Sequence, residues 1–130
     1  MATIKAHIGT DRYRTVLKTA TNNITADEPV SNGGADTGFS PSELLISALG
    51  ACTCITLRMY ADRKTWPLLT VDVDITFERD QERNVSNIHR QISLTGDLSE
   101  EQKSRLLKIA DQCYVHKILS NPIHITSALA

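Results

Sequence analysis

Hydrophobic and polar positions along the chain predict one helix that is apolar on nearly every side, together with several alternating strands. The apolar stretch lies between Phe39 and Arg63, where small or polar residues interrupt a run of leucine, isoleucine and alanine. A helix that is apolar all round is normally buried all round. Because the run is shorter and more interrupted than a membrane span of about 20 apolar residues, we expect the central helix of a soluble protein.

The beginning of this helix carries a clear start signal. Ser40 stands where an N-cap is needed and Pro41 follows at the first helical position. Glu43 completes an S-x-x-E capping box, in which the two side chains satisfy each other's backbone N–H groups.

Alternating segments predict strands before and after the central helix. Three short strands precede it: residues 3–8, 13–19 and 24–26, the first two forming a hairpin, followed by a loop over residues 27–38. After the helix, alternation from Leu69 to Phe77 indicates a strand with one buried face, and Ile88 to Leu94 would pair with it. Arg90 falls on the apolar side of the second strand, where we expect it to extend its stem toward solvent at a sheet edge.

The remainder of the chain predicts a second helix and a closing strand. Ser99 and Gln102 form another capping box, and an amphipathic helix should run from about Glu100 to Cys113. A short helical turn over residues 115–119 and a strand over residues 123–127 complete an α+β chain of order βββ-α-ββ-α-β. We expect a single domain over residues 1–130. The first helix needs more cover than one small sheet provides, which favours a partner subunit.

Composition narrows the classes of function. The net charge of the 130 residues is -1, so bulk electrostatics gives no reason to expect a nucleic-acid or membrane partner. The N-terminal residues lack the basic and apolar regions of a secretory signal. Three cysteines are too few for a disulfide scaffold. We therefore expect a cytoplasmic protein in which a free thiol can react.

The cysteines are the candidate reactive groups. Cys52 lies in the middle of the central helix and Cys113 at the end of the second helix, so that only the fold can bring them together. A cysteine on an apolar helix is more often a small core residue than a nucleophile. Cys54 lies about 200° around the helix from Cys52, and we interpret it as core packing.

Several motifs together resemble the OsmC/Ohr family, the osmotically inducible protein C and organic hydroperoxide resistance proteins. They are Ser40-Pro41, Ala51-Cys52, Cys113-Tyr114-Val115 and the segment from Gly34 to Leu45, which reads GADTGFSPSELL. The resemblance covers nearly the whole chain. It implies an OsmC-like fold in an intertwined homodimer, with the helices inside and the sheets outside.

The resemblance also implies a chemistry, that of a thiol peroxidase without haem, flavin, metal or other cofactor. Cys52 would attack a small-molecule hydroperoxide as a thiolate and become a sulfenic acid. Cys113 would resolve it to a disulfide, which an external dithiol would reduce. An arginine of the first hairpin, Arg14 or alternatively Arg12, would stabilise the thiolate, paired with a glutamate at the start of the central helix.

Two residues depart from the family pattern. The peroxidase branch of the family has Pro-Glu where this chain, like the small OsmC-like members, has Pro41-Ser42 with Glu43 one position later, and Glu43 is rotated by about 100° as a result. Glu43 therefore serves either as the capping-box residue or as the partner of the arginine. Tyr114 stands where the family usually has proline.

Two other functions remain open from the sequence. Cys52, Cys54, Cys113 and His116 are the residue types of a tetrahedral zinc site, although thiols in a C-x-C on a helix diverge. Alternatively, the chain forms a non-enzymatic OsmC-like dimer that binds a small apolar or thiol ligand at its interface cleft.

Overall fold

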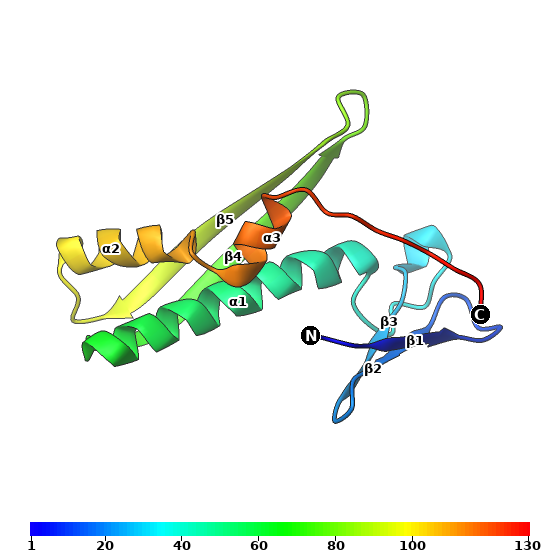
Figure 1. Cartoon of the computed structure of the whole chain (residues 1–130), viewed down its shortest axis with the longest axis horizontal. Coiled ribbons are helices and arrows are strands. Elements are labelled where there is room, and N and C mark those ends of the chain that lie inside the picture. Colours follow the sequence, from blue (N-terminus) through cyan, green and yellow to red (C-terminus); the bar gives the residue numbers. More distant parts are fainter. The chain divides into compact units, whose positions relative to one another are not determined.

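The computed structural model describes residues 1–130, and the chain forms two compact units, Met1–Leu45 and Ile46–Ala130. Figure 1 gives the order of their elements.

The first unit contains a three-stranded antiparallel sheet. Strands β1 (Lys5–Ile8), β2 (Thr15–Lys18) and β3 (Asn23–Ala26) pair in sequence order, as the alternation predicted, with slightly different bounds. A 3-10 turn, η1 (Val30–Asn32), lies in the following loop. This loop is held by buried Asp27: its Oδ1 accepts hydrogen bonds from Tyr13 N and Glu28 N, and its Oδ2 accepts from the backbone N–H and hydroxyl of Thr37.

Helix α1 (Pro41–Lys64) begins at the predicted capping box. The Ser40 N–H donates to Glu43 Oε1 at 2.8 Å, and the Glu43 N–H donates to Ser40 Oγ at 3.3 Å. Its 24 residues match the predicted stretch, but its length and composition alone would suffice for a membrane span, so the expectation that the apolar run is too short and too interrupted was wrong. Within the chain the buried residues of the helix are Leu49, Thr53, Leu57, Tyr60 and Ala61.

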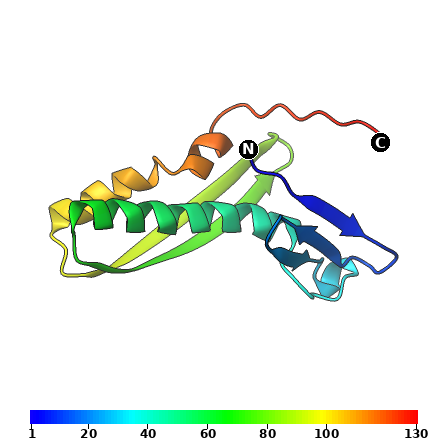
Figure 2. The ribbon, with the colours of Figure 1, turned by 60° about the horizontal axis from the view of Figure 1, so that its bottom comes forward.

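The second unit is a long hairpin with helices packed on it. Strands β4 (Leu68–Asp80) and β5 (Val85–Gly96) pair antiparallel, and α1 and α2 (Glu100–Ala110) contribute to one core with them (Figures 1 and 2). Helix α3 (Tyr114–Leu119) follows α2 after a short junction. The core residues are Leu57, Tyr60, Ala61, Leu68, Leu106 and Ala110.

Three details of the second unit differ from the sequence prediction. Leu69 is 71% exposed, because an irregularity in register between Leu68 and Thr70 turns Leu68 inward in its place. The closing strand over residues 123–127 does not form: this segment pairs with no other strand, and Ile125 is 84% exposed. Within the chain α1 is buried on one side rather than all round, with Ile55 and Met59 exposed.

Candidate functional site

The sulfur of Cys52 lies at the first turn of α3. The backbone N–H of Val115 donates a hydrogen bond to Cys52 Sγ at 3.5 Å, and Thr56 Oγ1, one turn along α1, lies 4.0 Å from the same sulfur. The first N–H groups of a helix have no partner inside that helix. The first turn of α3 therefore offers free donors to a thiolate at Cys52.

Cys113 is the residue that precedes α3, two positions before Val115, whose N–H reaches the Cys52 sulfur. Its side chain is fully buried, and its backbone, at φ −57° and ψ 135°, occupies the N-cap position of α3. The N–H of Cys113 donates to the carbonyl of Ala110 at 3.2 Å. The junction between α2 and α3 thus places Cys113 two residues before the N–H that contacts the Cys52 sulfur.

The two thiols have opposite tendencies to ionise. Partial burial opposes the ionisation of Cys52, but hydrogen bonding from the Cys113 thiol, the Val115 N–H, Thr56 and the Tyr114 N–H outweighs it and holds the pKa of Cys52 below its ordinary value. Burial raises the pKa of Cys113, and the interaction with Cys52 raises it further. The geometry therefore favours a thiolate at Cys52 next to a protonated thiol at Cys113.

The donors that lower the pKa of Cys52 were missed by the sequence analysis. The sequence pointed to an arginine, since Cys52 is far from the N-terminus of its own helix. The structure supplies N–H groups from α3 instead. The predicted helical turn directly after Cys113 was the signal that could have revealed them.

Cys54 lies in a different environment from Cys52. Its sulfur is 3.8 Å from the carbonyl oxygen of Val71 on β4, and burial, followed by the charge of Asp72, raises the pKa of this thiol. These properties are consistent with core packing. No three His, Cys, Asp or Glu side chains are grouped as ligands for a metal ion, so the zinc site of Cys52, Cys54, Cys113 and His116 is not formed.

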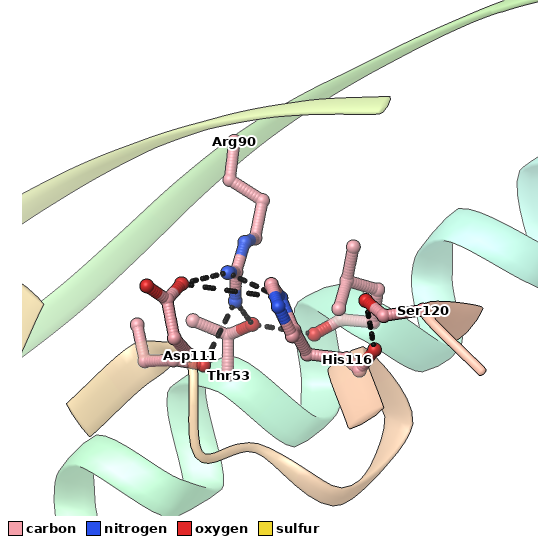
Figure 3. A network of polar contacts seen from close by, with 7 residues as sticks. Thr53, Arg90, Asp111, His116 and Ser120 are labelled. Atoms are coloured by element: carbon pink, nitrogen blue, oxygen red, sulfur yellow. Dashed lines mark hydrogen bonds and ion pairs between the residues drawn. The ribbon is translucent and has the colours of Figure 1, made fainter. Parts of the chain in front are cut away.

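Arg90 is the centre of a polar network, and the expectation that it extends toward solvent was wrong. Its side chain is 11% exposed and reaches from β5 to α1 and to the α2–α3 junction (Figure 3). Its Nη1 donates to Thr53 Oγ1 at 3.0 Å and to the Ala110 carbonyl at 3.1 Å. Its Nη2 contacts Asp111 Oδ1 at 3.0 Å and His116 Nδ1 at 2.9 Å.

The other predicted site residues lie in the first unit. Arg12 and Arg14 are exposed, and neither forms a salt bridge with a carboxylate of that unit. Glu43 makes the capping box with Ser40, whose backbone N–H and then side chain lower the pKa of the carboxyl group. A pairing of either arginine with the Cys52 thiolate stays a prediction.

Comparisons with known proteins bear on the family and the fold. The model of the OsmC-like protein family matches residues 33–128. No curated protein matches the chain in sequence.

Solved structures similar to this chain include three with related names. An OsmC like protein from Mycoplasma pneumoniae has a TM-score of 0.80 and 20% identity, over 92% of this chain and 87% of that chain. The organic hydroperoxide resistance protein OhrB of Bacillus subtilis has a TM-score of 0.63 and 18% identity, over 91% and 89%. An organic hydroperoxide resistance protein OsmC from Legionella pneumophila has a TM-score of 0.68 and 17% identity, over 92% of this chain and 88% of that chain. The predicted α+β, OsmC-like fold is confirmed.

Proposed function

The chain belongs to the OsmC-like protein family, and on that premise we propose that it is a cysteine-based peroxidase that reduces organic hydroperoxides. The observation that carries the proposal is the contact of the Cys52 sulfur with the N–H of Val115, two residues after Cys113, together with a lowered pKa of Cys52 and a raised pKa of Cys113. A peroxide-reducing thiol must ionise, because the thiolate is the nucleophile, and a resolving thiol must lie within reach of it. Solved structures of the same fold that are named organic hydroperoxide resistance proteins support the substrate class.

The proposed reaction has three steps. The Cys52 thiolate attacks one oxygen of the hydroperoxide, the O–O bond breaks, and the products are a sulfenic acid at Cys52 and an alkoxide that takes a proton to leave as an alcohol. The Cys113 sulfur then attacks the Cys52 sulfur, and a disulfide forms as water leaves. An external dithiol finally reduces this disulfide by exchange and is itself oxidised to a disulfide.

The proposal also includes an arginine and a glutamate, and a site that Glu43 shares with the Cys52 thiol would have to cross the dimer interface. Arg14, or alternatively Arg12, would stabilise the thiolate and the departing oxygen through its positive charge. Glu43 would orient the arginine in addition to capping α1. Neither haem, flavin nor a metal takes part in this scheme, since the electrons come from sulfur.

The protein is proposed to act as a homodimer in the cytoplasm, in an antioxidant stress response. The homodimer is supported by apolar side chains that are exposed on one side of α1 and at the adjoining end of β4. There Ile55, Met59 and Leu69 are 54%, 66% and 71% exposed and border a groove of about 410 Å³. Covering such a face with a second copy removes apolar surface from water.

Mass spectrometry of the intact, denatured protein tests the proposal. One equivalent of an organic hydroperoxide should remove two hydrogen atoms from the wild type and leave a Cys52–Cys113 disulfide. The Cys113→Ser variant should gain one oxygen at Cys52, which dimedone traps. Cys54→Ser is the control and should behave as the wild type does.

The opposite result would favour the alternative function. If all three thiols remain free after minutes of exposure, the two-cysteine mechanism is refuted. A dimer that binds a small apolar or thiol ligand would then be the better account, and ligand-dependent thermal stabilisation would be its measurement.

A further inference from the structure

Both Nη atoms of Arg90 are engaged in contacts inside the protein. Each Nη atom of a guanidinium carries two hydrogens. The four contacts of Nη1 and Nη2, to Thr53, Ala110, Asp111 and His116, use all four of them when His116 is in the tautomer whose Nδ1 accepts. An arginine saturated in this way has no Nη hydrogen left for a substrate, so its role lies in what it holds together.

The partners of Arg90 come from α1, from the end of α2 and from α3, and Figure 3 shows Thr53, Asp111 and His116 around the guanidinium. Thr53 is the residue next to Cys52 on α1, and it is fixed further because its hydroxyl donates to the Leu49 carbonyl at 2.7 Å. Asp111 comes two residues before Cys113, and His116 comes directly after Val115. Arg90 therefore links the segment that carries Cys52 to the junction that carries Cys113.

One of these partners is shared directly with Cys113. The Ala110 carbonyl accepts the Nη1 hydrogen of Arg90 at 3.1 Å and the backbone N–H of Cys113 at 3.2 Å. The last carbonyls of a helix have no partner inside it, and a cation at this end is favourable. Arg90 thus fixes the same carbonyl that holds the backbone of Cys113.

We propose that Arg90 is a positioning residue that holds Cys113 and the first turn of α3 against the Cys52 sulfur. It makes Cys52 reactive without being a catalytic residue itself. The planar fork of arginine can satisfy four acceptors in two directions, whereas a lysine at the same position offers a point charge with three donors. The inference adds a residue to the site proposed above, but it concerns the state of the thiols and can be tested without peroxide.

Two peroxide-free measurements on the full chain test the inference, both in a Cys54→Ser background. The first is the rate of Cys52 alkylation by iodoacetamide as a function of pH, with the site identified by mass spectrometry. The second is the rate at which diamide, which takes two hydrogen atoms from a dithiol, forms the Cys52–Cys113 disulfide. A residue with a merely structural role would change the melting temperature and leave both rates in the folded protein unchanged.

The expected result is specific to the guanidinium of Arg90. Arg90→Met should slow neutral-pH alkylation of Cys52 roughly five- to tenfold and move its pH profile upward, since a weakened hydrogen bond to a charged group is worth about that factor. Disulfide formation should slow to a similar extent. Arg79→Met is the matched control, because Arg79 is an exposed arginine whose contacts are with Ser86 and Asn84 of the same hairpin, and it should change neither rate.

Two other variants test whether Arg90 acts through the geometry of its hydrogen bonds or only through its positive charge. Arg90→Lys keeps the charge and should behave like Arg90→Met, so wild-type rates in this variant would overturn the inference. If Arg90→Met does not fold, Asp111→Ala removes one contact at a side chain that is 64% exposed, and it should shift both rates in the same direction by a smaller factor. Unchanged rates in Asp111→Ala would then overturn the inference. Failure of the peroxide assay alone would refute the proposed function and leave the role of Arg90 standing.

Discussion

Replacing Cys113 by serine or by alanine should separate its two contributions to the site. Of the interactions that favour the Cys52 thiolate, the one with the Cys113 thiol is the largest. Serine at this position keeps an O–H donor, whereas alanine has none. A hydrogen bond to a charged group is worth about 1.5 kcal/mol at the lower end of its range, and every 1.4 kcal/mol is about a factor of ten. We therefore expect Cys52 in Cys113→Ala to be alkylated roughly tenfold more slowly at neutral pH than in Cys113→Ser.

The assay is the pH dependence of Cys52 alkylation in a Cys54→Ser background, where only Cys52 remains as a thiol in both variants. At high pH, where Cys52 is ionised in each, the two rates should converge. Circular dichroism checks that both variants remain folded, because residue 113 is fully buried. Equal alkylation profiles for the two variants would refute the argument that Cys113 lowers the pKa of Cys52 through a hydrogen bond.

Three further predictions concern other parts of the chain. The pKa of Asp27 lies well below its ordinary value because of hydrogen bonds led by the Thr37 side chain, so its stabilisation is present above about pH 4 and is lost as the pH falls toward the folded pKa. Asp27→Asn should remove this acid dependence in urea titrations, and an unchanged dependence would contradict the assignment. Tyr114→Pro should leave the melting temperature unchanged, since proline suits a first helical position after an extended residue. It should slow Cys52 alkylation roughly two- to threefold by deleting one N–H donor, whereas a wild-type rate would exclude that donor. Leu106→Ala should lower the free energy of unfolding by about 2–5 kcal/mol, while exposed Leu129→Ala should change it by less than about 0.5 kcal/mol; equal costs in chemical denaturation would contradict the assigned core.

Local signals in the sequence were sufficient to predict where α1 and α2 begin and where most of the strands lie. Both capping boxes form as predicted, because their residues interact with backbone only three positions away. The alternation from Val71 to Phe77 likewise gives the buried face of β4. Leu69 was assigned to the wrong face because the irregularity beside it shifts the register of the pair, and no residue type in that segment marks the shift.

Features that depend on the meeting of distant segments were not predictable in the same way. The alternation placed Arg90 on the inner face of β5, but only the packed structure shows that a helix and a helix junction converge on its guanidinium. The closing strand was predicted from alternation alone, and alternation does not provide a neighbouring edge with which a strand can pair. Alternation also does not show which hairpin arginine would meet the Cys52 thiolate, so Arg14 and Arg12 both remain predictions.

The lowered pKa of Cys52 and the raised pKa of Cys113 bear on proton transfer in the proposed cycle. When Cys113 attacks the sulfenic acid, the departing oxygen needs a proton to leave as water. In the reduced protein the raised pKa of Cys113 keeps this thiol protonated beside Cys52. In the balance of the condensation, the proton of Cys113 and the hydroxyl group of the sulfenic acid leave together as water.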